Sequence, residues 1–539
     1  MSSAHLDTFA RDHLPPREEW PEFVFDLPEL VFPERQNAAE ELLDRAVFER
    51  GWGDRPAIRS ARETLTYRAL LERANRIARV LTEDLGLVPG NRVLLHGPNN
   101  AGTAAAWFGI VKAGGIVVAT MPLLRARELA TILQISQASH ALVDATVAAE
   151  LELARPEAPA LRSVVYFHHD GPESLEARCA GKPTDFANVD TSAEDVAILA
   201  FTSGTTGKPK GTMHFHRDLL AACRCFPPHV LRPTPEDVFC GTPPLAFTFG
   251  LGGLLLFPLA IGATTVLVEK LTPELLLETI DRYQATVCFT APTFYRMMAA
   301  IPPKHDLSSL RKCVSAGEAL PVPTREAWQT KTGLTILDGI GSTELLHMFI
   351  AHTEEEVRPG ATGKPIPGYR ARVVDEHGEP VPAGTVGRLA VQGPTGCRYL
   401  ADPRQRQYVQ DGWNFTGDAY KVDEDGYFHY QARTDDMIIS AGYNIAGPEV
   451  EDVLLAHPAV AECGVVGLPD EERGQVVAAF VVLRPDHEAG PERTRELQEW
   501  VKARIAPYKY PRVVFYRQTL PRTLTGKLQR FQLREETMP

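Results

Sequence analysis

The stretch Thr202-Ser-Gly-Thr-Thr-Gly-Lys-Pro-Lys-Gly211 directly follows an apolar run, Val196 to Phe201, that is typical of a buried strand. Its glycines, hydroxyl groups and lysines offer backbone N–H groups, hydroxyl donors and positive charge to the oxygens of a polyphosphate. We therefore predict a triphosphate-binding loop that begins where the strand ends. The residues of this loop are Thr202, Ser203, Gly204, Thr205, Thr206, Gly207 and Lys208.

The loop does not match the P-loop of nucleotide hydrolases. Only two residues separate Gly204 from Gly207, and Pro209 follows Lys208 where that motif requires a Ser or Thr for magnesium. We therefore do not expect a P-loop NTPase. A flexible surface turn made of the same residue types is the alternative interpretation of the loop taken alone.

Four further motifs follow this loop along the chain: Asp338-Gly-Ile-Gly-Ser-Thr-Glu344, Thr416-Gly-Asp418, Arg433-Thr-Asp-Asp436 with Ser440-Ala-Gly442, and Thr523-Leu-Thr-Gly-Lys527. In type and order they resemble the motifs of the adenylate-forming superfamily, which contains acyl- and aryl-CoA ligases, luciferases and the adenylation domains of peptide synthetases. The resemblance extends from about residue 50 to 530. It implies ATP, Mg²⁺ and, for the ligases, coenzyme A as cofactors.

Composition places the chain among ordinary globular proteins. With 539 residues, 44% of them apolar and 23% charged, it is too long for one core, so we expect at least two domains. A net charge of −13 argues against a nucleic-acid partner. The eight cysteines form no CxxC pair, and the N-terminus carries charge where a signal peptide would be apolar, so we expect reduced core cysteines in a cytoplasmic protein. A homodimer is left open.

One segment, Leu245 to Val268, has no charged residue and is long enough to span a bilayer. Several glycines and Pro258 divide it, and its last residues, Ala263 to Val268, are typical of a β-branched strand. We therefore predict a buried helix followed by a strand, and no membrane partner.

The first half of the chain has an α/β pattern. Residues 92–95, 101–113 and 116–119 read as strand, helix and strand, which predicts a parallel sheet with ligand loops at the carboxyl ends of its strands. Similar signals recur later, with strands at 285–290 and 335–338 and a helix from Pro292 through Met298.

After residue 433 the elements become shorter and alternate: helix 450–456, strands 460–468 and 476–483, and helix 493–505. This pattern predicts a separate α+β domain. We therefore expect an α/β fold with a large N-terminal domain, residues 1–433, and a small C-terminal domain, residues 436–539. The resemblance implies that the small domain is mobile about a hinge at residues 434–435.

Joining a carboxylate to a thiol requires a better leaving group, which ATP provides by forming an acyl-adenylate and pyrophosphate. Because two anions must meet, electrostatic stabilisation is the main demand on the protein. Glu344 stands beside hydroxyl donors, as suits a ligand of Mg²⁺, and Thr343 can bond a phosphate oxygen. A helix cap is the alternative explanation of this Ser-Thr-Glu run.

The remaining nucleotide and CoA residues are implied by the resemblance. Asp418 corresponds to the ribose ligand, because a carboxylate accepts two hydrogen bonds from a vicinal diol, and Arg433 is its partner. The family usually has Gly before this arginine, whereas this chain has Ala432. Lys527 corresponds to the catalytic lysine and Asp435 to the pivot of the small domain. The other implied residues are Ala316, Gly317, Glu318, Asp338 and Gly339 for the nucleotide, and Ser440, Ala441 and Gly442 for the pantetheine tunnel.

The acid is predicted to be aromatic. The resemblance places Phe247 and Phe249 in the family's acid-gating segment, which in this chain lacks the aspartate typical of amino-acid adenylation domains. The segment from Gly341 to Ile350, with His347 on an expected helix, resembles that of benzoate-type CoA ligases. The opening residues Asp12 to Pro16 resemble 2-aminobenzoate CoA ligases, so we place 2-aminobenzoate ahead of benzoate. His347 is interpreted either as a substrate contact or as a hydrogen-bonded structural histidine.

Three alternatives remain at this level. A stand-alone adenylation enzyme that loads a carrier protein would use the same motifs, as would a ligase for a non-aromatic acid. An inactive nucleotide-binding module is disfavoured because Lys527, Glu344 and Asp435 occur together.

Overall fold

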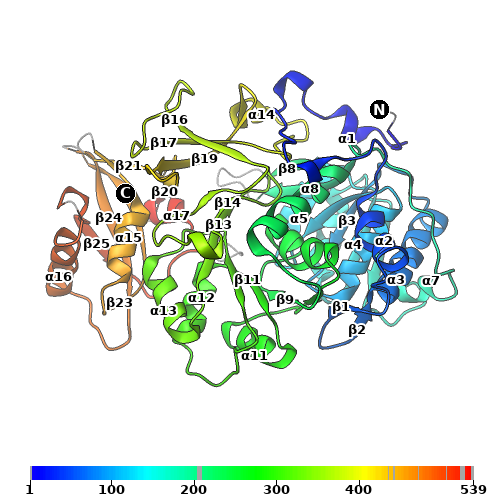
Figure 1. Ribbon diagram of the computed structural model, residues 1–539, viewed down its shortest axis with the longest axis horizontal. Helices are drawn as coiled ribbons and strands as arrows, with labels where there is room; N and C mark the ends of the chain where they lie inside the picture. Colours follow the sequence, from blue (N-terminus) through cyan, green and yellow to red (C-terminus); the bar gives the residue numbers. More distant parts are fainter. Residues whose placement is uncertain are drawn as a thin grey trace.

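The computed structural model describes residues 3–202, 209–434, 436–440, 443–470, 473–505, 507–522 and 528–535. Within these residues the strands form four sheets. Figure 1 shows the three sheets of the large domain together and the elements of the C-terminal domain, in orange and red, at one end of the molecule. The predicted α/β fold with a distinct α+β C-terminal part is confirmed.

The first sheet has the strand order β6-β5-β3-β4-β7-β8 and is parallel except for β8, which runs antiparallel to β7. The predicted strand, helix and strand at 92–119 are confirmed, with the two strands paired in parallel. The strands are β3 (Arg92–His96), β4 (Ile116–Thr120), β5 (His140–Asp144), β6 (Ser163–Phe167), β7 (Val196–Thr202) and β8 (Lys210–Phe215).

The second sheet has the order β15-β14-β13-β12-β11-β9-β10-β1-β2, and its central strands from β13 to β1 are parallel. The carboxyl ends of these central strands therefore lie along one edge. The strands are β1 (Pro56–Arg59), β2 (Thr64–Thr66), β9 (Val238–Gly241), β10 (Thr264–Val266), β11 (Val287–Thr290), β12 (Lys312–Ser315), β13 (Ile336–Gly341), β14 (Met348–Ala351) and β15 (Lys364–Pro365).

The two remaining sheets are largely antiparallel. In one, β16 (Arg370–Val374), β17 (Gly387–Gln392), β19 (Trp413–Val422) and β18 (Val409–Gln410) follow in that order, and β20 (Phe428–Arg433) pairs with β19. The C-terminal sheet has the order β22 (Tyr443–Ile445), β21 (Ile438–Ser440), β24 (Gly474–Leu483) and β23 (Val460–Asp470), and β25 (Val513–Tyr516) pairs with β24.

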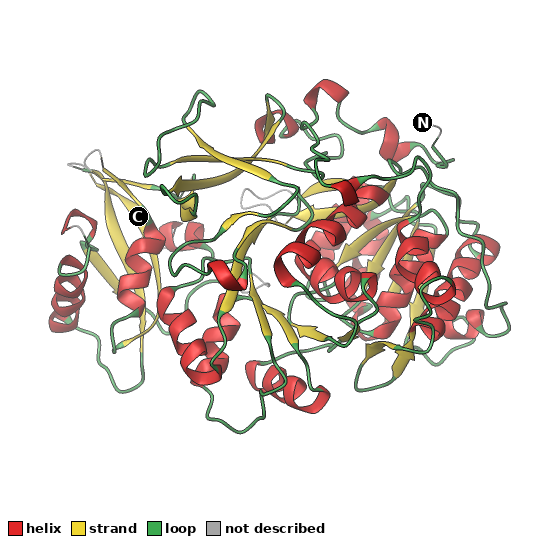
Figure 2. Ribbon diagram, viewed as in Figure 1, coloured by secondary structure: helices red, strands yellow, loops and turns green. Residues whose placement is uncertain are grey.

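Helices cover both faces of the large parallel sheets (Figure 2). The largest core cluster combines buried residues of α3, α4 and α8 with inward-facing residues of both sheets, so these helices lie between the sheets. The helices are α1 (Phe9–Asp12), α2 (Arg45–Phe48), α3 (Tyr67–Arg79), α4 (Ala101–Lys112), α5 (Ala126–Ser136), α6 (Ala149–Ala154), α7 (Leu175–Cys179), α8 (His216–Phe226), α9 (Thr248–Leu251), α10 (Phe257–Ala260), α11 (Pro273–Tyr283), α12 (Pro292–Ala300), α13 (Val322–Thr332), α14 (Gln405–Tyr408), α15 (Gly447–Leu455), α16 (Pro491–Lys502) and α17 (Arg530–Glu535).

Two expectations about the core can be compared with the structure. Leu245–Val268 forms α9, the π-helical turn η8 (Gly252–Leu256), α10 and β10, as predicted, and the described residues contain no helix of the length and apolarity that a bilayer requires. All eight cysteines are free. Six are buried, and Cys179 and Cys223 are partly exposed and pack against the edge of the largest core cluster.

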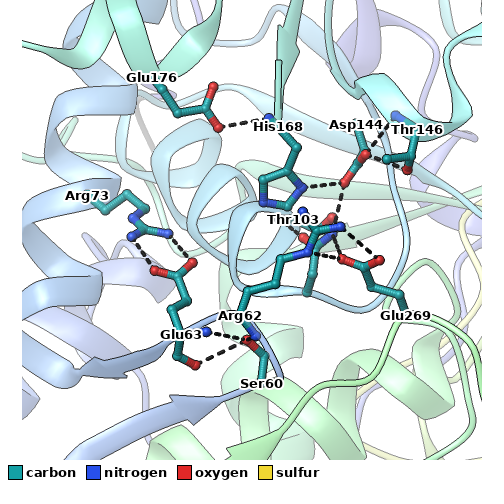
Figure 3. A network of polar contacts seen from close by, with 11 residues as sticks. Ser60, Arg62, Glu63, Arg73, Thr103, Asp144, Thr146, His168, Glu176 and Glu269 are labelled. Atoms are coloured by element: carbon teal, nitrogen blue, oxygen red, sulfur yellow. Dashed lines mark hydrogen bonds and ion pairs between the residues drawn. The ribbon is translucent and has the colours of Figure 1, made fainter. Parts of the chain in front are cut away.

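A polar network joins the two parallel sheets near the carboxyl end of β5 (Figure 3). Asp144 accepts hydrogen bonds from His168 Nδ1 at 2.8 Å and from Asn100 Nδ2 at 2.9 Å. Glu269, which follows β10, forms an ion pair with Arg62 at 3.0 Å. Burial raises the pKa of Asp144, but the hydrogen bonds from His168 and its other donors outweigh burial and lower it to about 2. Asn100 also caps α4, so this network fixes the start of that helix.

A buried ion pair connects α8 with the segment that precedes α14. Arg398 donates to Asp218, and neither side chain has exposed surface. The Arg398 guanidinium also lies 3.9 Å from the centre of the Phe215 ring. Backbone hydrogen bonds from Met213 N to Arg398 O and from Leu400 N to Gly211 O hold this segment along β8.

Replacing Arg398 by Leu should destabilise the protein strongly, because the buried Asp218 carboxylate would lose its nearest counter-charge and keep only the more distant Arg217, at 3.9 Å, and His214, at 3.8 Å. We expect a loss of about 3–5 kcal/mol in unfolding free energy, measured as a shift of the urea-induced transition. Arg406→Leu is the control, because Arg406 pairs with Glu19 while keeping 77% of its side chain exposed. That change should cost less than about 1 kcal/mol. Equal losses in the two variants would contradict the importance of the buried pair.

Candidate active site

The predicted phosphate loop connects two antiparallel strands. Thr202, the last residue of β7, pairs with Lys210, the first residue of β8. The loop residues Ser203, Gly204, Thr205, Thr206, Gly207 and Lys208 lie outside the described residues. Because a strand and not a helix follows the loop, the expectation that this is no P-loop is confirmed.

Lys210 links the end of this loop to Glu344. Lys210 Nζ donates to the Tyr399 hydroxyl at 2.7 Å, Tyr399 donates to Glu344 Oε1 at 2.5 Å, and Lys210 Nζ lies 3.6 Å from the same oxygen. Burial, with the nearby Glu344 carboxylate, raises the pKa of Tyr399, so its hydroxyl remains a donor. Sequence reasoning missed both partners of Glu344. The lysine belongs to the quoted loop stretch, but no local signal marks Tyr399.

Thr343 and Glu344 lie in the turn between β13 and β14. Ser342 Oγ accepts from Leu345 N at 3.2 Å, and the Thr343 carbonyl accepts from His214 Nε2 at 2.7 Å. No helix follows this turn, so the alternative of a helix cap is wrong. At Gly341 a Cβ would lie 2.6 Å from the His347 carbonyl oxygen, and this close approach requires glycine.

Glu344 fits the ligand chemistry of Mg²⁺. Its carboxylate is a hard oxygen donor, only 7% exposed and held in place by Tyr399. Among the described residues no group of three His, Cys, Asp or Glu side chains is arranged to hold a metal. Magnesium commonly uses one or two carboxylates together with substrate phosphates and water. Glu344 can therefore contribute to a site that ATP completes.

Asp418 and Arg433 face each other across β19 and β20. They are paired residues in the sheet, and Arg433 Nη1 donates to Asp418 Oδ1 at 3.0 Å. The Asp418 carboxylate is nearly buried, at 7% exposure. Ala432, the departure from the family pattern, is buried within β20. The two residues thus meet as the resemblance implies.

The predicted nucleotide residues on the second sheet also lie side by side. Ala316, Gly317 and Glu318 follow β12, whose last residue Ser315 pairs with Asp338 of β13. Burial raises the pKa of Asp338 to about 7, and its Oδ1 has no hydrogen-bond partner among the described residues. At Gly339 a Cβ would lie 2.1 Å from Met348 Cε. Glycine therefore keeps β13 in close contact with β14.

His347 lies in an aromatic cluster and not on a helix, which corrects the prediction. Its ring centre is 4.5 Å from that of Phe257, 5.3 Å from Phe226 and 5.7 Å from Phe249. Burial lowers the pKa of His347 to about 3, so the ring is neutral. Neither ring nitrogen makes a hydrogen bond of standard geometry with the residues described, and the Phe249 backbone, as a weaker hydrogen-bond partner, opposes the effect of burial on this pKa.

The acid-gating segment is fixed by a residue that sequence reasoning missed. Asn99 donates to Pro243 O at 2.9 Å and accepts from Leu245 N at 2.8 Å. The ring of Phe249, at the start of α9, lies against the ring of His347. Phe247 is partly exposed and takes no part in the ring contacts among the described residues. Asn99 directly precedes the cap of α4, so the gating segment is tied to the first sheet.

In the C-terminal domain Ser440 is buried and accepts from Arg473 Nε at 3.3 Å. Arg522 and Leu528 form an isolated antiparallel bridge on either side of the segment that contains Lys527. Lys527, Asp435, Ala441 and Gly442 lie outside the described residues, so the site does not test these four predictions.

Two family models match the chain, one described as AMP-binding enzyme over residues 44–399 and one as AMP-binding enzyme C-terminal domain over residues 449–527. The Benzoate--CoA ligase of Thauera aromatica is 38% identical over 513 residues, covering 94% of this chain and 97% of that protein. The crystal structure of the anthranilate CoA ligase AuaEII in complex with anthranoyl-AMP is 36% identical, with a TM-score of 0.89 over 94% of this chain and 98% of that chain.

MatB from Rhodopseudomonas palustris, 29% identical, provides structures in two states. The TM-score is 0.85 for the ATP-bound structure and 0.76 for the apo structure, each covering 93% of this chain and 98% of that chain. The arrangement of this chain is thus closer to the ATP-bound structure. The family models and the relatives agree with the geometry of the site: the chain belongs to the family of AMP-binding enzymes and is an acid–thiol ligase.

Proposed function

We propose that this enzyme uses ATP to convert an aromatic carboxylic acid into acyl-AMP and pyrophosphate, and then transfers the acyl group to CoA with release of AMP. The observation that carries the proposal is the turn after β13. Within three residues it directs Glu344 to Lys210 and Tyr399, and His347 into a cluster of aromatic rings. The residue proposed to hold magnesium and a cluster of aromatic side chains therefore meet at one turn.

In the first step, an oxygen of the acid attacks the α-phosphorus of ATP and pyrophosphate leaves. Lys210 and the N–H groups of the loop that it follows would offset the repulsion between the two anions. Glu344 would hold Mg²⁺, which supplies further positive charge to the phosphates when it is bound. Asp418, oriented by Arg433, would accept hydrogen bonds from the ribose hydroxyls.

Residues of the hinge and of the C-terminal domain would complete the two steps. Lys527 would contact the acid and the α-phosphate during adenylation, and Asp435 would be the pivot of the small domain. Ser440, Ala441 and Gly442 would line the path of pantetheine in the second step, when the CoA thiol attacks the acyl carbonyl and AMP leaves.

The nucleotide would be bordered by residues of the large domain: Ala316, Gly317, Glu318, Asp338 and Gly339.

The aromatic cluster supports an aromatic acid, with 2-aminobenzoate ahead of benzoate. Phe249 and Phe247 would offer flat walls to the ring, and the backbone of Gly341 would lie beside the reacting carboxylate. A neutral His347 has one unprotonated ring nitrogen, which would be the acceptor for one N–H of an ortho-amino group. A Benzoate--CoA ligase and an anthranilate CoA ligase among the relatives are consistent with this choice.

The direct test is acid-dependent release of pyrophosphate from ATP, with and without CoA. The acids compared are 2-aminobenzoate, benzoate, a medium-chain fatty acid and an α-amino acid. We expect turnover that CoA sustains and a higher kcat/KM for the aromatic acids. Adenylation that is indifferent to CoA would instead favour the enzyme that loads a carrier protein.

Replacing His347 by Leu tests the contact with the amino group. Losing one hydrogen bond should lower kcat/KM for 2-aminobenzoate about tenfold, with a much smaller change for benzoate. Phe257→Leu is the control, because it alters the same wall without removing a polar atom. It should affect both acids alike. Equal losses for both acids in His347→Leu would contradict the contact.

Replacing Lys527 by Ala should separate the two half-reactions. Adenylation should fall by roughly 10²-fold or more, because a charge that stabilises the transition state is lost. Thioester formation from added acyl-AMP should be largely retained in single-turnover measurements. Lys502→Ala, at a partly exposed lysine paired with Glu499 on α16, should leave both steps unchanged. Parallel losses in both steps of Lys527→Ala would refute its assigned role.

A further inference from the structure

A chain of four charged side chains crosses from the large domain to the C-terminal domain. Arg296 of α12 donates to the carbonyl of Ala461 at 2.9 Å and lies 3.2 Å from Glu462 Oε1. Arg522 donates to the other oxygen of Glu462 at 2.9 Å and lies 3.8 Å from Glu318 Oε1. We name Arg296, Glu462, Arg522 and Glu318 the interdomain ion-pair chain.

The charges of this chain alternate, and the large domain contributes its two ends while the small domain contributes its two central members. Arg296 and Glu318 belong to the large domain, and Glu462 and Arg522 to the small one. Between 18% and 31% of each side chain is exposed, so solvent screens the pairs only in part. Thr293 Oγ1 donates a hydrogen bond to Glu318 Oε2 at 2.7 Å and fixes the position of this carboxylate. The carboxylate is therefore preorganised for Arg522.

The position of the chain relates it to the reaction. Glu318 belongs to the nucleotide segment after β12, and Arg522 stands five residues before Lys527. The bridge between Arg522 and Leu528 brackets the segment that contains this lysine. The ion pairs therefore hold Arg522, which directly precedes that segment, next to the nucleotide segment. The whole arrangement is closer to ATP-bound than to apo MatB.

We propose that the interdomain ion-pair chain holds the small domain in the orientation for adenylation and must break before the thioester step. Arg296, Glu462 and Arg522 are then positioning residues that act through the placement of Lys527. Their loss would reduce the population of the adenylating orientation and leave the chemistry of each site intact. This inference rests on the proposed two-step function.

The first test neutralises the centre of the chain with Glu462→Gln and one end with Arg296→Gln. Adenylation is followed by acid-dependent exchange of pyrophosphate with ATP, and thioester formation is followed from added acyl-AMP and CoA. We expect a three- to tenfold loss in adenylation, and an unchanged or faster thioester step. Arg296→Lys keeps the charge and should retain most of the adenylation rate. Arg282→Gln, on the neighbouring helix α11 where Arg282 lies over Tyr283, is the matched control and should change neither step.

A cross-link tests the orientation directly. Cysteines in the double variant R296C/E462C, joined by a short bismaleimide, would hold the domains as they stand in the structure. The cross-linked enzyme should still exchange pyrophosphate with ATP but should form thioester at least tenfold more slowly than the same variant without the reagent. The wild type treated with the reagent controls for its eight native thiols.

The outcomes separate the two proposals. If the wild type forms no thioester with CoA, the proposed function fails. If the wild type performs both steps, the ion-pair chain is overturned when Glu462→Gln and Arg296→Gln match it in both steps or lose both equally. Thioester formation at the full rate by the cross-linked enzyme would also overturn it.

Discussion

The buried charge of Arg398 is the constraint on which the geometry of the site depends. A guanidinium without solvent must be neutralised where it lies, and Asp218 at the start of α8 does so. The pair fixes the segment beside β8, and Tyr399 is the next residue. Its hydroxyl therefore arrives between Lys210 and Glu344, which joins the phosphate loop to the proposed magnesium ligand.

A second constraint is the tight connection between β13 and β14. The absence of a side chain at Gly341 lets the strand approach the carbonyl of His347, and Gly339 allows the same approach to the carbonyl of Ile350. This close approach places the side chains of two residues in the same turn in different environments. Glu344 meets a lysine and a phenol, whereas His347 enters aromatic surroundings where burial keeps it neutral. One turn thus separates the proposed phosphate site from the proposed site of the acid.

The ion pairs at the domain interface control the orientation of the small domain, which the residues of the two proposed sites do not fix by themselves. Its ion pairs are partly exposed, and each is individually weak in water, so the orientation that they favour can be exchanged for another at modest cost. A large apolar interface would hold the domains too firmly for two successive arrangements. The alternating charges between α12 and β23 therefore suit a domain that binds the large domain in one orientation for adenylation and is released for the thioester step.

Much of the architecture could be predicted from the sequence, because strand and helix signals depend on residues close together in the chain. The strand, helix and strand at 92–119, the buried segment 245–268 and the ordered motifs determined the fold class and the family. The pairing of Asp418 with Arg433 followed from the motifs as well. Local patterns did not determine the environment of His347, because a turn and not a helix precedes β14. Nor could they indicate that Tyr399 meets Lys210 and Glu344 or that Arg296 meets Glu462, since these partners are 189, 55 and 166 residues apart. Only the order of the strands and the docking of the domains bring such distant side chains within hydrogen-bond distance.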